Sequence, residues 1–121
     1  MTGKKILIVD DEPEIREMLS RFLKEQGYIV TAIPNGSQAL SYIQEEIPHL
    51  LITDLLLPGE HGLDLVRAVK KKWYIPTIVL SGVYRREEIN TVMGEESVEA
   101  FFQKPVDLNR LAQTVAKLLD E

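Results

Sequence analysis

Five short apolar runs, separated by segments of helical periodicity, are the feature that most constrains how this chain can fold. They cover residues 6–9, 28–33, 50–53, 77–80 and 99–102. Their length and their flanking Pro and Gly residues favour strands over buried helices. Continuous apolar runs, without the polar alternation of a half-exposed strand, are typical of parallel sheets covered on both faces.

Helical segments fill the intervals between the runs. One begins near Pro13, carries apolar residues at helical spacing and ends before Gly27. Others follow Gly36 and Gly62, residues 85–93 form a weakly patterned fourth, and the last begins near Asp107. Alternating strands and helices predict an α/β fold with a doubly wound, five-stranded parallel sheet. This is a flavodoxin-like (βα)5 architecture with strand order 2-1-3-4-5.

Composition narrows the class of protein. The 121 residues predict a single domain spanning residues 1–121. A net charge of −5 argues against direct nucleic-acid binding, and the absence of cysteine excludes disulfides and thiolate metal sites. No apolar run approaches the roughly 20 residues of a membrane span, so we expect a soluble cytoplasmic domain without a membrane partner.

The predicted strands end in residues that carry chemistry. Asp10 and Asp11 follow the first strand, Asp54 ends the third, Ser81 follows the fourth and Lys104 follows the fifth. Ligands of doubly wound sheets bind beyond the carboxyl ends of the strands. The topology therefore predicts that these side chains converge at one edge of the sheet.

Converging carboxylates repel one another unless a hard cation lies among them, and an all-oxygen site suits Mg²⁺. A carboxylate can also be a nucleophile that forms an acyl phosphate. The Lys104 ammonium would supply positive charge to the phosphoryl oxygens, and the Ser81 hydroxyl can donate a hydrogen bond. The set predicts phosphoryl transfer to Asp54.

Each of these residues also has a purely structural interpretation. Asp54 alone could be a helix cap, the Asp10–Asp11 pair could favour a helix start, and Ser81 could satisfy its own backbone in a turn. Their joint placement at strand ends favours the chemical interpretation.

Over essentially its whole length the chain resembles a response-regulator receiver domain of two-component signalling, similar to the chemotaxis regulators. The resemblance rests on Asp10–Asp11, Asp54 with Pro58 and Gly62 after it, Ser81–Gly82 and Lys104–Pro105. It implies that Asp54 is the phosphoacceptor. It also implies that Asp10 and Asp11 hold Mg²⁺ with Asp54 and the backbone carbonyl of Leu56.

The resemblance assigns further roles. The residue at the Ser81 position contacts the phosphoryl group and shifts towards it, and the one at the Lys104 position pairs with it. The aromatic residue Phe101 would turn inward on activation, changing partner preference at the face formed by the fourth helix, fifth strand and fifth helix. Leu56 and Val83 occupy positions that influence water attack; both are apolar, so we expect slow self-dephosphorylation.

The predicted function is a phosphorylation-controlled switch of a two-component phosphorelay. The donor would be a sensor histidine kinase or phosphotransfer protein, and the output a downstream protein or an effector domain outside this sequence. The chain would catalyse its own phosphorylation but act as a switch rather than as an enzyme. Homodimerisation stays open.

Three rival functions are compatible with the same α/β architecture. A flavin- or nucleotide-binding protein would place a glycine-rich loop after the first strand, where Asp10–Asp11–Glu12 stands. A hydrolase would want a general acid close after Asp54, and Leu55–Leu56–Leu57 offers none. A pseudo-receiver, an interaction module that is never phosphorylated, stays the alternative.

Overall fold

The computed structural model describes residues 3–82 and 86–119. The strands of its main sheet are β1 (Lys5–Val9), β2 (Ile29–Ile33), β3 (Leu50–Asp54), β6 (Thr77–Ser81) and β7 (Ala100–Gln103). A short hairpin, β4 (Leu56–Leu57) and β5 (Glu60–His61), follows β3. The helices are α1 (Pro13–Glu25), α2 (Gly36–Glu45), α3 (Gly62–Lys72), α4 (Arg86–Met93) and α5 (Leu108–Leu118).

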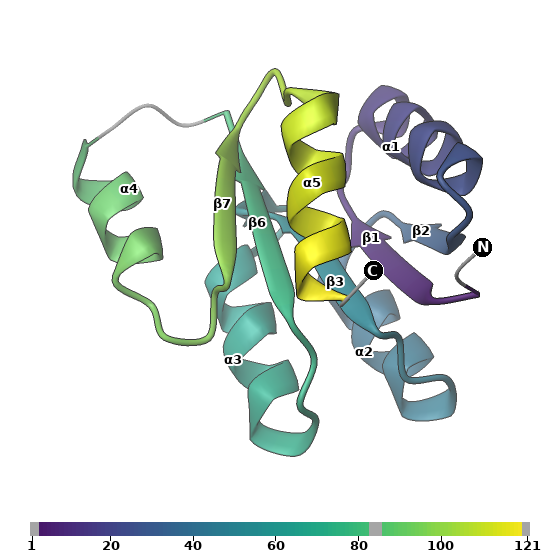
Figure 1. Cartoon of the computed structure of the whole chain (residues 1–121). Helices are drawn as coiled ribbons and strands as arrows, with labels where there is room; N and C mark the ends of the chain where they lie inside the picture. Colours follow the sequence, from purple (N-terminus) through teal and green to yellow (C-terminus); the bar gives the residue numbers. More distant parts are fainter. Residues whose placement is uncertain (1–2, 83–85, 120–121) are drawn as a thin grey trace.

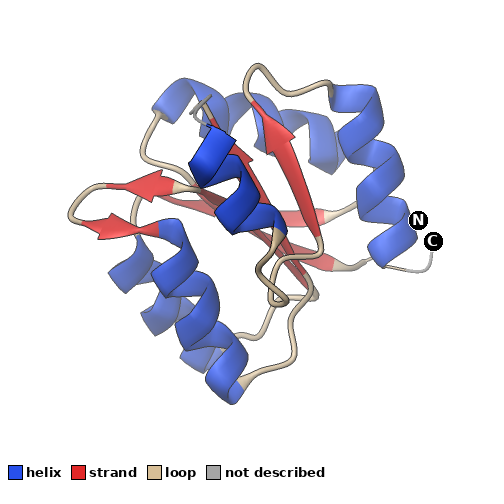
Figure 2. Cartoon of the chain, turned by 90° about the vertical axis from the view of Figure 1, so that its left-hand side faces the viewer, coloured by secondary structure: helices blue, strands red, loops and turns tan. Residues whose placement is uncertain are grey.

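The main sheet is parallel and its strands lie in the order β2-β1-β3-β6-β7. Counted along the chain, these are the five predicted strands in the predicted order, so the doubly wound α/β fold is confirmed. The antiparallel β4–β5 hairpin was not predicted and accounts for the gap in the strand labels. Figure 1 shows the helices around the central sheet, and Figure 2 shows the hairpin projecting from it.

Two apolar layers hold the sheet between its helices. On one face Ile8 and Ile52 pack against Leu19 of α1 and Leu111 of α5. Side chains alternate between the faces of a strand, so the other face carries a second layer. There, Leu7 and Leu51 meet Ile43 of α2 and Val69 of α3, among other residues. This full coverage explains why β3 and β6 are buried at every position.

Several predicted boundaries need small corrections. The second strand begins at Ile29, because the N–H of Tyr28 donates to the carbonyl of Leu23 in the last turn of α1 at 3.2 Å and pairing with β1 starts one residue later. The fifth strand runs from Ala100 to Gln103, one residue later than predicted, although the backbone N–H of Glu99 already donates to the carbonyl of Thr77 at 2.9 Å. Arg85, the predicted start of α4, lies outside the described residues, as does Val83.

The end of α1 follows the prediction. Gly27 takes a positive φ of 102°, a conformation that glycine reaches without steric penalty.

No helix in the part of the chain that the structure describes is long and apolar enough to cross a membrane.

Candidate phosphoacceptor site

The backbone brings the chemical residues to one edge of the sheet. Asp10 directly follows β1, and its N–H donates to the carbonyl of Ile33 at the end of β2 (3.1 Å). Asp54 is the last residue of β3 and Ser81 the last of β6. The N–H of Lys104, just after β7, donates to the carbonyl of Ser81 at 2.7 Å. The predicted convergence at the carboxyl ends is therefore observed.

Lys104 lies at the centre of the acidic residues. Its Nζ is 2.9 Å from Oδ2 of Asp10, 2.9 Å from Oε1 of Glu12 and 3.3 Å from Oδ2 of Asp54. The Asp10 contact is an ion pair rather than a well-directed hydrogen bond, since Oδ2 of Asp10 has no hydrogen-bond partner among the described residues. One ammonium is thus shared by three carboxylates that come from two segments of the chain.

The electrostatics of the site follow from its burial. Asp54 is 6% exposed, and this burial raises the pKa of its carboxyl group. The nearby Lys104 ammonium counteracts the rise, and the charge of Asp10 adds to it. Burial also works against the charged form of Lys104, but Glu12, Asp10 and Asp54 together outweigh it and raise the pKa of Lys104 above the usual lysine range.

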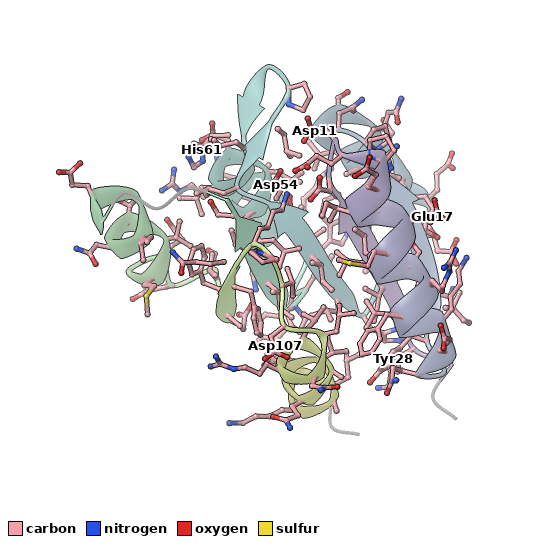
Figure 3. All side chains as sticks on the ribbon, turned by 90° about the horizontal axis from the view of Figure 1, so that it is seen from above. Asp11, Glu17, Tyr28, Asp54, His61 and Asp107 are labelled. Atoms are coloured by element: carbon pink, nitrogen blue, oxygen red, sulfur yellow. The ribbon has the colours of Figure 1, made fainter. Side chains whose placement is uncertain are left out.

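The acidic cluster can hold a metal ion. Asp10, Asp11, Glu12 and Asp54 each offer a carboxylate oxygen, and these oxygens lie within 4.8 Å of one another. Asp10 is fully buried, whereas Asp11 and Glu12 are exposed. A buried carboxylate oxygen without a hydrogen-bond donor is a fitting ligand for a hard divalent cation. Figure 3 shows Asp11 and Asp54 at this end of the molecule.

A hollow opens above the acidic cluster. It is lined by Asp11, Glu12, Asp54, Leu56, Ser81, Gly82 and Lys104. The Ser81 side chain is buried, and the Leu56 side chain is 49% exposed. The acceptor carboxylate, the hydroxyl group and the ammonium thus border one space.

The turn after β3 depends on Gly62. Its N–H donates to the carbonyl of Leu55, and a Cβ at this position would overlap the carbonyl oxygen of Asp54. The neighbouring His61, interpreted from the sequence as an ordinary loop residue, instead ends β5 and caps the N-terminus of α3: its Nδ1 accepts the N–H of Leu63 at 3.2 Å. Close packing of the hairpin against the end of β3 therefore fixes the acceptor's backbone.

Phe101 lies away from this site. It packs with Val79 and Val92 and lines a groove between α4, β7 and α5. Ile89 and the exposed Met93 border the same groove. The structure thus brings together every predicted site residue except Phe101, which borders the predicted output face.

Glu12 is the site residue that sequence reasoning missed. The acid directly after the Asp10–Asp11 pair was interpreted as favouring the start of α1 and as arguing against a nucleotide-binding loop, but not as a partner of Lys104. Its contact with Lys104 spans 92 positions of the chain. The available signal for a role of Glu12 was its position next to the acid pair. Position in the sequence does not determine the direction of its side chain.

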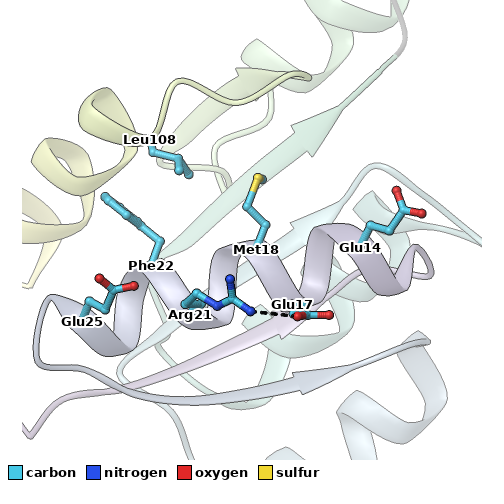
Figure 4. Close-up of a pocket in the computed structure, with 7 residues that line it drawn as sticks. All are labelled: Glu14, Glu17, Met18, Arg21, Phe22, Glu25 and Leu108. Carbon is cyan, nitrogen blue, oxygen red and sulfur yellow. Dashed lines mark hydrogen bonds and ion pairs between the residues drawn. The ribbon is translucent and has the colours of Figure 1, made fainter.

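A second hollow lies between α1 and α5. Its lining residues are Glu14, Glu17, Met18, Arg21, Phe22, Glu25 and Leu108 (Figure 4). The apolar side chains of Met18, Phe22 and Leu108 form its centre, and Glu17 pairs with Arg21 at 3.0 Å on its rim. The groove runs along α1, whose N-cap residue Glu12 belongs to the acidic cluster.

Comparison with known proteins agrees with this geometry. The family model of the response regulator receiver domain matches residues 6–116. An uncharacterized 14.6 kDa protein from the sodA1 3′ region of Leptolyngbya boryana is 37% identical over 113 residues, which are 91% of this chain and 86% of that protein. The chain therefore belongs to the response regulator receiver domain family, and its signalling class is that of two-component systems.

Two further relatives differ in how much of their own length this chain covers. The DNA-binding response regulator MtrA of Mycolicibacterium smegmatis is 34% identical over 93% of this chain, which spans only 49% of MtrA. The solved chemotaxis response regulator CheY4 of Vibrio cholerae is 27% identical, with a TM-score of 0.86 over 98% of this chain and 100% of that one. The similarity to both covers nearly all of this chain.

Proposed function

We propose that this receiver domain is a cytoplasmic phosphorylation switch whose phosphoacceptor is Asp54. The observation that carries the proposal is the meeting of the Asp54 carboxylate with the Lys104 ammonium, at 3.3 Å, beside the acids that follow β1. Family membership supports a role in two-component signalling. The donor we propose is the phosphohistidine of a sensor kinase or phosphotransfer protein.

In the proposed reaction an oxygen of the Asp54 carboxylate attacks the phosphorus atom of the donor. A P–O bond forms and the P–N bond of phosphohistidine breaks, leaving the electron pair on the imidazole nitrogen, which takes up a proton. Lys104 and the Ser81 hydroxyl would stabilise the phosphoryl oxygens. Asp10, Asp11, Asp54 and the carbonyl of Leu56 would hold Mg²⁺, which supplies positive charge to the transferring group.

The groove between α1 and α5 suits the docking of the donor protein. Its apolar centre, Met18, Phe22 and Leu108, has a charged rim and lies along α1, the helix that begins directly after Glu12 of the acidic cluster. We propose that output passes through a separate face, formed by α4, β7 and α5. There Phe101 links the interior to a groove bordered by exposed Met93.

The proposal is tested by intact mass after incubation with a small phosphodonor and Mg²⁺. We expect one phosphate adduct on the wild type, and none on Asp54→Asn or in Mg²⁺-free buffer. A folded wild type that stays unmodified with the small donor and with phosphohistidine donors would contradict the proposal and favour the pseudo-receiver. The chain would then act only as a binding module.

We also propose slow loss of the phosphoryl group. The half-exposed Leu56 side chain borders the hollow and cannot orient a water molecule. Leu56→Asn would introduce hydrogen-bonding groups there, so we expect faster release of inorganic phosphate from the phosphorylated variant. A Leu56→Met variant, which keeps the position apolar, should behave like the wild type. Slower release from Leu56→Asn would contradict this prediction.

A further inference from the structure

Glu12 occupies the N-cap position of α1 but does not cap it. Residues at this position commonly accept a hydrogen bond from a backbone N–H of the first turn. The Glu12 side chain makes no such bond and instead reaches Nζ of Lys104 at 2.9 Å. Its backbone N–H donates to Oδ1 of Asp10 at 2.9 Å, which ties the Glu12 backbone to the acidic cluster.

The partners of Lys104 are also the proposed ligands of the metal. Its ammonium pairs with Asp10 and Asp54, the two buried carboxylates of the cluster. A divalent cation that binds these carboxylates repels the ammonium, and the repulsion is strong where water is scarce. Lys104 must then give up part of its pairing, although its side chain is only 13% exposed.

The Glu12 carboxylate gives the Lys104 ammonium a partner that is not needed to bind the metal. Its carboxylate is about half exposed, and it contacts the ammonium on the solvent side of the cluster. An ammonium that remains paired with Glu12 stays within reach of Asp54 while the carboxylates of Asp10 and Asp54 coordinate the metal. Without Glu12, the ammonium would compete with the metal for both buried carboxylates.

We propose that Glu12 is a positioning residue that retains Lys104 when Mg²⁺ binds, so that metal and ammonium occupy the site together. This inference rests on the proposed function, because it concerns the metal and the lysine of that site. It differs from direct ligation of the metal by Glu12, since Glu12 would act through Lys104.

The test measures the affinity of the purified chain for Mg²⁺ alone, by isothermal titration calorimetry. We expect Glu12→Gln to raise the dissociation constant about fivefold, within the range of coupling between residues in contact. Asp64→Asn is the matched control, since Asp64 is an exposed acid in the first turn of α3 outside the acidic cluster. It should change the constant by less than about twofold.

A second background separates the two roles of Glu12. In Lys104→Met no ammonium needs a partner, so adding Glu12→Gln should change Mg²⁺ affinity by about twofold or less. Lys104→Gln serves the same purpose if the Met variant does not fold, as judged by circular dichroism. A fivefold effect that persists without Lys104 would overturn the proposal in favour of direct ligation.

The remaining outcomes are also decisive. Equal affinities of Glu12→Gln and wild type would overturn the inference while leaving the proposed function intact. If folded wild type binds no Mg²⁺, the proposed metal-dependent function fails first. The two failures are therefore distinguishable in one set of titrations.

Discussion

The acidic residues at the carboxyl end of the sheet differ in burial and in pairing from the acidic residue Glu99 at the amino end. At the carboxyl end, Asp10 and Asp54 are buried and share one ammonium with a third acid. At the amino end, Glu99 is near the surface, pairs with Lys70 at 3.2 Å and accepts the N–H of Thr77. A buried acid with incomplete partners destabilises a fold, whereas a well-satisfied one supports it. The difference indicates that the carboxyl end is arranged for chemistry rather than for stability.

The largest effect on stability should come from Gly62→Ala, which disturbs the backbone at the carboxyl end of the sheet. The new Cβ would overlap the carbonyl oxygen of Asp54, so either the hairpin or the end of β3 must move. We expect the free energy of unfolding to fall by about 3 kcal/mol, measured by urea denaturation. Gly82→Ala is the control at the same end, since its Cβ would meet no atom within 4 Å. Equal losses in both variants would contradict this account of Gly62.

Glu99→Ala should give the next largest effect, at the amino end. It leaves the N–H of buried Thr77 without this acceptor and removes the pairing with Lys70. We expect a loss of about 1–2 kcal/mol in the free energy of unfolding. The exposed neighbour Glu96, changed to Ala, should shift it by less than about 0.5 kcal/mol. A Glu99→Ala variant as stable as the wild type would remove the contrast between the two ends.

Asp54→Asn should act in the opposite direction and more weakly. Because burial raises the pKa of Asp54, its stabilising contribution is complete only below the unfolded pKa of about 3.9 and is lost as pH rises through the raised value. At pH 7 the ionised carboxylate therefore destabilises the fold. The variant should melt a few degrees higher than wild type in Mg²⁺-free buffer.

The pH dependence sharpens this prediction. The gap between Asp54→Asn and wild type should narrow as the pH is lowered through the raised pKa of Asp54. It should close below the unfolded pKa of about 3.9, where the carboxyl is protonated in both the folded and the unfolded state. Calorimetry at a series of pH values measures it. A variant that is less stable than wild type at pH 7 would show that the Lys104 pairing outweighs burial.

The two ends also differ in how far the sequence could predict them. The residues at the carboxyl end follow directly from strand topology: Asp54, Ser81 and Lys104 each stand where an apolar run stops. Apolar runs and breaker residues determine such positions locally. This is why the doubly wound fold and the convergence of the site were predictable from the pattern alone, whereas alternation by itself does not determine the strand order.

What the sequence could not supply were contacts that depend on side-chain direction. The Glu12 side chain turns away from its own helix towards Lys104, and the Glu99 side chain accepts the N–H of Thr77. In both cases the direction of the side chain depends on a partner that is distant in the sequence. The β4–β5 hairpin was missed for a related reason, since its two-residue strands carry too little periodicity to detect.

The most direct test of the central claim is the location of the phosphoryl group after Mg²⁺-dependent labelling. Borohydride reduces an aspartyl phosphate to homoserine, which peptide mass mapping then identifies at a single position. We predict homoserine at position 54 in the labelled wild type, and none there when Mg²⁺ is withheld. Labelling at another carboxylate, or labelling that survives in Asp54→Asn, would contradict the assignment of Asp54 as the acceptor.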